Sequence, residues 1–385
     1  MMMAATARTI EEMTRDGSKH PRVAFLLKSA RRRRLESGEA IPGEFFYGYV
    51  QLQETGWDVA LIEQDDLGVG LTEARAWTAV NRLSHALLGL NLRALWQLAR
   101  ARSRRQLNEF DRVVVAQNSL GFCLCLLHGL GIVKPRPVFI MMGGIDTEVR
   151  GVAGLVRRRL LKFSDASSLS RGEADALAAC HGLRLHYIPF GVDTRFWTPD
   201  AANNDADDDY VLAIGNDPQR DYATLLAAWA PDLPRLKIVS RLVTGPVADN
   251  VEVIAGHYES AAITDADIRD LYRGARFVII PVRETLQPSG QSACLQAMAC
   301  GKAVILSDIE GLWDRTAMRD GETCVLVPPG DVEAMDLAVR SLLSDPAYAA
   351  TIGLAARQAT ETQLDVSVMT EAVAALCRRG EGSEP

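Results

Sequence analysis

Residues Pro288–Asp308, PSGQSACLQAMACGKAVILSD, predict a turn, a short helix and a buried strand in succession. The Pro-Ser-Gly turn leads into a segment rich in alanine, leucine and methionine, which Gly301 ends. The run Ala303–Leu306 that follows is apolar throughout, which is typical of a strand buried on both faces of a parallel sheet. The start of the helix carries serine, glutamine and glycine but no carboxylate, a pattern that suggests a ligand of negative charge.

The same alternation of apolar runs and helical segments extends along most of the chain. Strands that alternate with helices indicate βαβ units and a parallel sheet. We therefore expect an α/β protein with two Rossmann-like, doubly wound domains that face each other across a cleft. The expected strands are Val23–Leu27, Trp57–Ile62, Arg112–Ala116, Pro137–Met142, Tyr210–Ile214, Leu236–Val239, Val251–Ile254 and Phe277–Pro281.

Length and composition agree with a globular protein of two domains. The chain has 385 residues, of which 48% are hydrophobic and 24% are charged. Its net charge of −7 provides no general attraction to nucleic acid, and no nucleic-acid partner is expected. No apolar run approaches the roughly 18 residues of a membrane span. Seven cysteines without paired metal-ligand spacing suggest reduced, buried thiols in a cytoplasmic protein.

The domain boundary is expected at the polar stretch Asp200–Asp209. Residues 1–200 would form the first domain and residues 205–363 the second. Residues 1–20 lack an apolar core and a cleavage site, so we expect a disordered leader and not a secretion signal. Because ligands of open α/β sheets bind at the carboxyl ends of the strands, the cleft is the expected site.

Two segments of the second domain predict an anion site, and the first is the start of the helix that follows Pro288. Ser289, Gly290, Gln291 and Ser292 stand at a helix N-terminus, where free N–H groups and the helix dipole favour phosphate. The alternative is that Ser289 only caps the helix.

The loop Gly215–Tyr222 follows a strand, contains Asn216, and brings Arg220, whose fixed charge suits a diphosphate. The alternative role for Arg220 is a surface ion pair with Asp217 or Asp221. Arg241, after the next strand, is grouped with the same donor site.

Four motifs together resemble a known enzyme family. They are Ile188–Thr194, the Gly215 loop, Gln296–Ile305 and Asp320–Asp331. This pattern resembles the retaining GT-B glycosyltransferases of the large GT4-like group, glycosyl transferases group 1. The resemblance implies a first domain that binds the acceptor, a nucleotide-diphospho-sugar donor on the second domain, and a last helix within residues 364–385 that crosses back to the first domain.

The chain departs from that family at positions that matter for catalysis. The family usually has two glutamates eight positions apart, which fall here on Pro288 and Gln296. Gln296 could still hold the ribose hydroxyls by hydrogen bonds, so Gln296→Glu should be tolerated. Glu284 could replace the missing first glutamate if its loop is remodelled. A frequent histidine would fall near Met142-Gly143, where Gly144 would let the sugar or acceptor pass close to the backbone. The catalytic candidates are Arg220, Glu284 and Gly144.

The remaining site residues follow from the same comparison. His257 and Tyr258 fall where the family seats the nucleotide base, although ordinary loop packing is the alternative. The acceptor-binding candidates on the first domain are Lys28, Glu44 and Asn118. Asp-x-Asp matches at 205–209 lack a preceding strand, so we expect no metal site and no cofactor.

Basic segments at 93–105 and 157–162 lie in the first domain. A solvated helix face is one interpretation, and a peripheral contact with an anionic membrane or acceptor at the inner membrane face is the other. Together these features predict a metal-independent, retaining glycosyltransferase with an unidentified acceptor (glycolipid, saccharide or natural product). A sugar-nucleotide epimerase or hydrolase, or a non-catalytic binding protein, are the alternatives.

Overall fold

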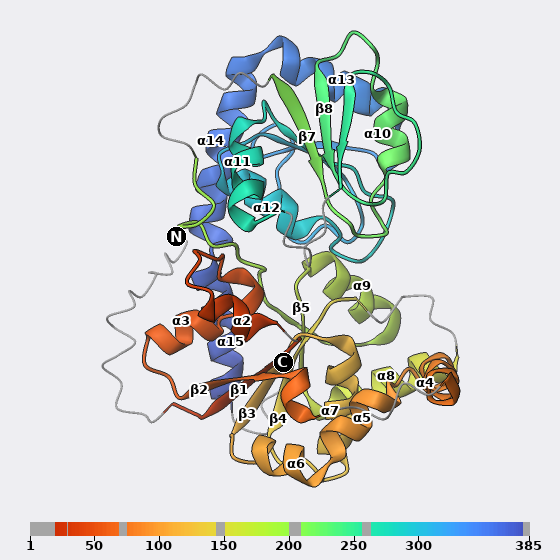
Figure 1. The fold of residues 1–385 in the computed structure, drawn as a ribbon, viewed down its shortest axis with the longest axis vertical. Coiled ribbons are helices and arrows are strands. Elements are labelled where there is room, and N and C mark those ends of the chain that lie inside the picture. The colour runs from red at the N-terminus through yellow and green to blue at the C-terminus, as the bar shows by residue number, and fades with distance from the viewer. Residues whose placement is uncertain are drawn as a thin grey trace.

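Two parallel six-stranded sheets, each in its own domain, form the framework of the protein (Figure 1). The structure, a computed structural model, describes residues 20–28, 30–68, 75–143, 151–199, 209–255 and 263–379. The N-terminal domain, coloured red to yellow-green, lies below the C-terminal domain, coloured green to blue. The predicted α/β fold with two facing domains is confirmed.

The N-terminal sheet has the strand order β2-β1-β3-β4-β5-β6. Its strands are β1 (Val23–Leu27), β2 (Val59–Glu63), β3 (Arg112–Val115), β4 (Arg136–Met141), β5 (Asp165–Ser168) and β6 (His186–Tyr187). Helices cover both faces, as a sheet with apolar side chains on both sides requires. These helices are α2 (Arg31–Glu36), α3 (Tyr49–Glu54), α4 (Arg75–Leu88), α5 (Leu92–Ala99), α6 (Ala101–Leu107), α7 (Asn118–Gly129), α8 (Val152–Leu160) and α9 (Arg171–His181), with 3-10 turns η1 (Glu44–Phe46), η2 (Gln64–Leu67) and η3 (Leu161–Phe163).

The C-terminal sheet has the order β12-β11-β10-β7-β8-β9 and is also parallel throughout. Its strands are β7 (Tyr210–Ile214), β8 (Arg235–Val239), β9 (Val251–Ile254), β10 (Val278–Ile280), β11 (Val304–Ser307) and β12 (Val325–Val327). Its helices are α10 (Tyr222–Ala228), α11 (Asp265–Gly274), α12 (Gln291–Ala299), α13 (Val332–Ser344) and α14 (Pro346–Gln363). The opening stretch of the sequence therefore forms α12 and β11, as predicted.

The chain passes between the domains at two places that lie side by side. After β6 the first pass runs through Val192, and the second pass runs through Asp365 into α15 (Val366–Arg378), which packs on α3 and β4 of the N-terminal domain. The backbone of Val192 bonds both neighbours of Asp365: its N–H donates to Leu364 O (2.9 Å), and its carbonyl accepts from Val366 N (2.9 Å). The two passes thus form one short parallel bridge between the domains.

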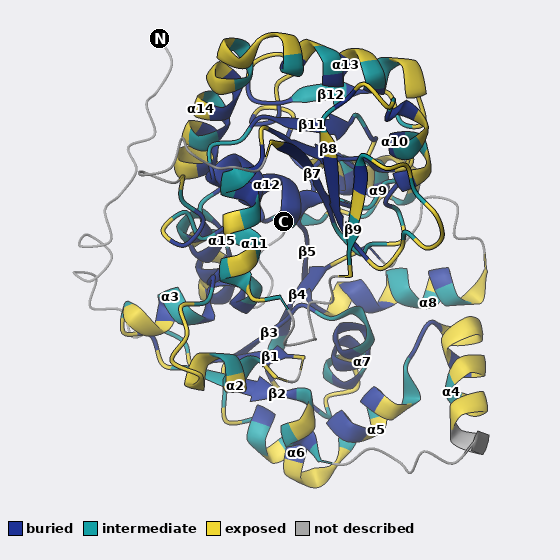
Figure 2. Cartoon of the chain, turned by 45° about the horizontal axis from the view of Figure 1, so that its top comes forward, coloured by how far each residue is buried: buried dark blue, intermediate teal, exposed yellow. Residues whose placement is uncertain are grey.

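The domains are also joined by direct contacts in the described residues. The N-terminus of α9 meets the loop after β11: Ser170 Oγ donates to Gly311 O (3.0 Å) and Arg171 N to Trp313 O (2.9 Å). One hydrophobic cluster includes Phe25 of β1, Trp197 between the domains and Leu295 of α12. Figure 2 shows this buried core continuing through the middle of the molecule.

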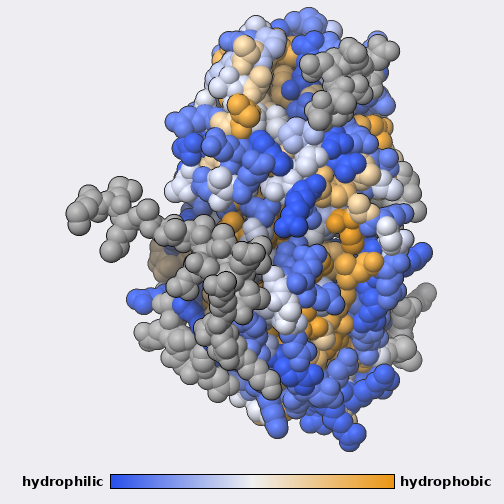
Figure 3. All heavy atoms as spheres, turned by 90° about the vertical axis from the view of Figure 1, so that its left-hand side faces the viewer, coloured by the Kyte–Doolittle hydropathy of each residue, from blue (hydrophilic) through white to orange (hydrophobic). Residues whose placement is uncertain are grey.

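Seen from the side of α3 and α14, the surface is mostly hydrophilic, with hydrophobic residues gathered near the junction of the domains (Figure 3). None of the helices within the described ranges is long and apolar enough to cross a membrane. All seven cysteines are unpaired, and Cys180 alone among them is exposed, against the expectation that every thiol is buried.

Candidate functional site

A cavity of about 530 Å³ opens between the two domains, where the carboxyl ends of the strands face each other. The C-terminal domain contributes the loop after β7, part of α11 and the start of α12. The N-terminal domain contributes η1 and the end of β4, and the passing chain contributes Phe190 and Trp197. The cavity therefore lies at the position expected for a ligand of a doubly wound fold.

The loop after β7 is built around Gly215. Its φ is +141°, and a Cβ there would overlap the guanidinium of Arg220, so only glycine leaves room for that side chain. The Gly215 carbonyl accepts hydrogen bonds from Tyr222 Oη (2.8 Å) and Ser240 Oγ (2.7 Å). Asn216 Oδ1 accepts from the backbone N–H of Arg241 (2.8 Å). The loop is thus held in place by the protein itself.

Arg220 is buried against this loop and has no ion-pair partner among the described residues. Only 5% of its surface is exposed, and its Nε and Nη1 atoms lack any hydrogen-bond acceptor. The predicted alternative, a surface ion pair with Asp217 or Asp221, is wrong. Asp221 caps α10 by accepting from Thr224, and Asp217 Oδ1 accepts from the Gln219 N–H (2.8 Å). A buried guanidinium without a partner is costly, which indicates that an anion belongs there.

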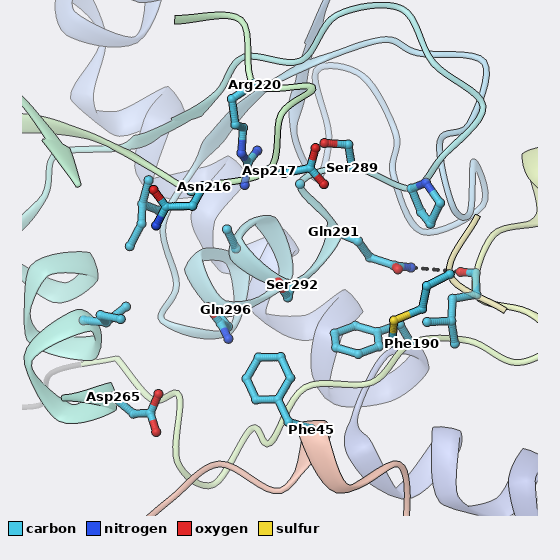
Figure 4. A pocket seen from close by; sticks show the side chains of 18 of the residues that line it. Phe45, Phe190, Asn216, Asp217, Arg220, Asp265, Ser289, Gln291, Ser292 and Gln296 are labelled. Carbon is cyan, nitrogen blue, oxygen red and sulfur yellow. Dashed lines mark hydrogen bonds between the residues drawn. The ribbon is translucent and has the colours of Figure 1, made fainter. Parts of the chain in front are cut away.

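The start of α12 completes this anion site. Gly290 is the N-cap residue with φ +87°, and a Cβ there would lie 2.6 Å from Arg220 Nη1. Ser289 is buried, and its Oγ makes no hydrogen bond, so the alternative that Ser289 serves as a helix cap is wrong. Arg220 and Ser289 lie on the same side of the cavity, next to the first turn of α12 (Figure 4). The first turn of α12, Ser289 Oγ and Arg220 thus bring hydrogen-bond donors to the same side of the cavity.

Two glutamines of α12, one in its first turn and one in its second, contact the first domain. Gln291 Nε2 donates to Leu169 O (2.9 Å), as the dashed line in Figure 4 marks. Gln296 Nε2 donates to Glu44 Oε1 (3.1 Å), while Gln296 Oε1 accepts from Tyr272 Oη (3.3 Å). Ser292 lines the cavity between them. Gln296 lines the same cavity, and the prediction that it binds the ribose stays a prediction, although its amide nitrogen and oxygen both already bond within the protein.

Glu44 is fully buried, with 0% of its surface exposed, and does not line the cavity. Its carboxylate accepts from Trp197 Nε1 (2.7 Å) and Asp193 N (3.2 Å) as well as from Gln296. Burial raises the pKa of Glu44 to about 7, although these hydrogen bonds oppose the shift. The prediction that Glu44 binds the acceptor is therefore corrected: it joins the two domains.

Apolar and aromatic side chains form the rest of the cavity wall. Phe45 faces Gln296 from the N-terminal domain (Figure 4), and Ile268 of α11 lines the same cavity. Asp265 of α11 pairs with Arg34 of α2 across the cleft. Burial raises the pKa of Asp265, and the nearby arginines oppose that rise. A ligand with a flat ring at one end and phosphates at the other would match these surroundings.

Several predicted residues lie away from the cavity. Glu284 is exposed, and its Oε1 accepts from the N–H groups of Thr285 and Glu310, so the loop holds it outward and its predicted catalytic role is corrected. Arg241 and Lys28 are exposed and do not line the cavity. Asn118 Nδ2 donates to Met142 O (3.0 Å) and so fixes the end of β4 without lining the cavity.

The predictions for Gly144, His257 and Tyr258 lie outside the described residues, as does most of the Asp-x-Asp stretch. Conversely, Phe45, Tyr47, Asp265 and Gln287 line the cavity but were not predicted. The aromatic run at 45–49 could have indicated Phe45 and Tyr47, since aromatic residues beside a cleft often contact ligands. Nothing in the sequence placed Asp265 opposite Arg34.

Comparisons with known proteins bear on the family and the fold. Residues 208–345 match the family described as Glycosyl transferases group 1. The alpha-maltose-1-phosphate synthase of Mycolicibacterium smegmatis is 27% identical over 60% of this chain and 66% of its own length. The glycogen synthase of Mycobacterium tuberculosis is 39% identical over 25% of this chain and 23% of its own. The chain thus spans less than two thirds of these relatives.

Solved structures match over nearly the whole chain. Sucrose-phosphate synthase from Thermosynechococcus elongatus has a TM-score of 0.67 at 18% identity, covering 92% of this chain and 98% of its own. Anabaena HepE in complex with UDP and glucose has a TM-score of 0.65 at 14% identity, covering 92% and 99%. Residues 208–345 are therefore similar to the group 1 glycosyl transferases, and the chain as a whole has the GT-B fold of two Rossmann-like domains.

Proposed function

We propose that this protein transfers a sugar from a nucleoside-diphosphate sugar to an acceptor, with retention and without a metal ion. The observation that carries the proposal is the buried guanidinium of Arg220, which lacks acceptors at Nε and Nη1 and lies beside the start of α12. The Anabaena relative was solved with UDP and with UDP-glucose, which supports a donor of that class.

The proposed donor lies along the cavity with its diphosphate at Arg220. Gly215 and Gly290, which have no side chains, leave room for the guanidinium itself, because a Cβ at either position would overlap it. The base would extend toward Ile263 and Ile268, which line the far wall. Two positive sources, Arg220 and the α12 dipole, supply the charge that a metal ion supplies in metal-dependent transferases.

The proposed reaction breaks the bond between the anomeric carbon and the diphosphate oxygen. Negative charge then develops on the leaving diphosphate, where Arg220 and the α12 N–H groups stabilise it. The acceptor hydroxyl attacks from the same face and gives its proton to the departing phosphate, so that the new bond retains the anomeric configuration. No side-chain nucleophile is required by this route, and Glu284 lies outside the cavity.

A nucleotide panel tests the proposal. Thermal unfolding is measured with UDP-, GDP-, ADP- and dTDP-sugars in the presence of EDTA. A ligand at about 100 times its dissociation constant should stabilise the fold by roughly 2.7 kcal/mol. Products with candidate acceptors are then identified by mass spectrometry, and their anomeric configuration by NMR.

Three outcomes would contradict parts of the proposal. If no nucleotide sugar raised the melting temperature, or if the rise required Mn²⁺ or Mg²⁺, the metal-free anion site at Arg220 would be contradicted. Release of nucleoside diphosphate at the same rate with and without acceptor would indicate a hydrolase. Donor binding with no turnover on any acceptor would indicate a binding protein.

A further inference from the structure

One side of the N-terminal domain combines basic charge with exposed apolar side chains. Residues 75–107 contain seven arginines and no aspartate or glutamate, and residues 151–164 contain four basic residues and no acidic one. The whole chain, by contrast, carries a net charge of −7. The positive charge is therefore concentrated on the helices formed by these segments, α4, α5, α6 and α8.

The exposed apolar residues lie on α4 and α8, which pack against each other. On α4, Val80, Leu83 and Leu87 follow a spacing of three and four residues and so share one stripe, with Leu83 59% exposed. On α8, Val152 and Leu155 form a second stripe, with Val152 62% exposed. Figure 2 shows both helices at the edge of the domain, with exposed positions along them. We call these five residues the α4/α8 apolar patch.

Exposed basic side chains flank this patch. Arg82 lies on α4 beside Leu83, and Arg159 continues the α8 stripe one turn beyond Leu155. Arg157 instead joins α8 to its neighbours, since its Nε donates to Gly89 O (3.2 Å) and its guanidinium lies over the ring of Phe122. The predicted basic segment 93–105 contributes less apolar surface, because Ala94, Gln97 and Leu98 of α5 face inward.

We propose that the α4/α8 apolar patch and its flanking arginines dock this protein onto an anionic lipid bilayer. Apolar side chains would enter the boundary between headgroups and acyl chains, and Arg82 and Arg159 would meet lipid phosphates. A second copy of the chain fits this surface less well, because both sides of a two-fold interface would carry the same positive charge. This docking surface is separate from the donor cavity and goes beyond the transfer reaction.

Vesicle flotation tests the proposal with the full chain. Wild-type protein should float with vesicles of phosphatidylcholine containing 30% phosphatidylglycerol and not with phosphatidylcholine alone. Binding should weaken as salt rises from 0.1 to 0.5 M, because ions screen the arginine contribution. The double variant Leu83→Glu/Leu87→Glu should lose at least tenfold in partitioning. Arg82→Gln and Arg159→Gln should each lose about fivefold at 0.1 M salt.

The matched control places the same change on the other domain. Leu337 of α13 and Leu354 of α14 are also strongly exposed, at 61% and 72%, so Leu337→Glu/Leu354→Glu should float like wild type. Melting temperature and its shift with nucleoside diphosphate should be unchanged in every variant, which shows that folding and the donor site are intact.

Failure of the wild type to float with anionic vesicles would overturn the proposal, as would wild-type behaviour of Leu83→Glu/Leu87→Glu. Dimers that form in solution without lipid, and that Leu83→Glu/Leu87→Glu abolishes, would assign the patch to a second copy instead.

Discussion

Gln296 Nε2 donates a hydrogen bond to Glu44 Oε1 over 3.1 Å, across the boundary between the two domains. The carboxylate belongs to η1 of the N-terminal domain and the amide to α12 of the C-terminal domain. Both side chains are buried, at 0% and 7% exposed, and water would compete little for this bond. An amide at position 296 is therefore required by its partner, because a second carboxylate would face Glu44.

Gln296→Glu should destabilise the protein, contrary to the expectation from sequence. Two buried carboxylates in contact cannot both ionise, so the loss in melting temperature should be larger at pH 8 than at pH 5.5. Thermal unfolding at both pH values measures this. The exchanged pair Glu44→Gln/Gln296→Glu should recover part of the loss, and Gln287→Glu, on the same cavity, should show little pH dependence. If Gln296→Glu and wild type were equally stable at pH 8, residue 296 would not contact the Glu44 carboxylate in solution.

Glu44 should also make wild-type stability depend on pH. Its pKa in the folded protein is about 7, above the ordinary value of 4.5, so the folded state holds the proton more tightly than the unfolded state. The contribution of this group is therefore fully present below pH 4.5 and is lost as pH rises through 7, a change of about 3 kcal/mol. Urea unfolding of wild type and Glu44→Gln from pH 4.5 to 8.5 measures this contribution as the difference between their free energies of unfolding. Parallel curves for the two proteins would show that Glu44 does not titrate in this window.

Arg220→Met should abolish nucleotide binding without weakening the empty protein. The guanidinium is buried without a partner, and replacing an unpaired charge by an apolar side chain of similar length is neutral or stabilising. The thermal shift with nucleoside diphosphate should fall by most of its size. Arg283→Met is the control, because Arg283 is exposed and outside the cavity. An Arg220→Met protein that melts much lower yet still responds to nucleotide would assign Arg220 a structural role.

Gly290→Ala should damage both folding and the anion site. Its φ of +87° disfavours any side chain, and a Cβ would lie 2.6 Å from Arg220 Nη1 and from Ile280 Cγ2. Gly131→Ala is a close control, since Gly131 has φ +70° but open space around it. Gly290→Ala should cost about 1–3 kcal/mol more than Gly131→Ala in urea unfolding and should lose the nucleotide response. Similar losses in both variants would mean that backbone strain alone is responsible.

Glu284→Gln should leave transfer activity within about twofold of wild type. The carboxylate is exposed and bonds only to loop N–H groups among the contacts described above, so its removal should cost at most about 1 kcal/mol of stability. Steady-state kinetics with the identified donor would measure this. A loss of a hundredfold or more would show that the loop rearranges to bring Glu284 to the sugar.

The sequence was sufficient to predict most of the fold because its strands are continuous apolar runs. β1, β7 and β11 are fully buried, and each was read directly from such a run. The sequence does not reveal β5, because it reads Asp-Ala-Ser-Ser and its buried Asp165 depends on ion pairs with Arg112 and Arg136. These partners lie 53 and 29 residues away, so no local pattern could reveal them.

The anion site was also predictable, because a glycine turn at a helix start is a local signal, and Arg220, Ser289 and Gly290 all lie together. The role of Gln296 was not, since its partner Glu44 is 252 residues away. The catalytic role of Glu284 is suggested only by its position along the chain. The direction of its side chain is set by the hydrogen bond that it accepts from the N–H of Glu310. Contacts between domains are set by how the domains dock, which neither periodicity nor motif spacing encodes.

The paired crossing at Val192 and Asp365 restricts how this protein can open. Two separate tethers would allow one domain to slide or twist on the other, but tethers bonded to each other at one point act as a single pivot. We expect the domains to rotate about that pivot without sliding past each other. Contacts across the cleft, such as Gln291 with Leu169 and Arg34 with Asp265, would then break when the domains rotate apart and form again when they close.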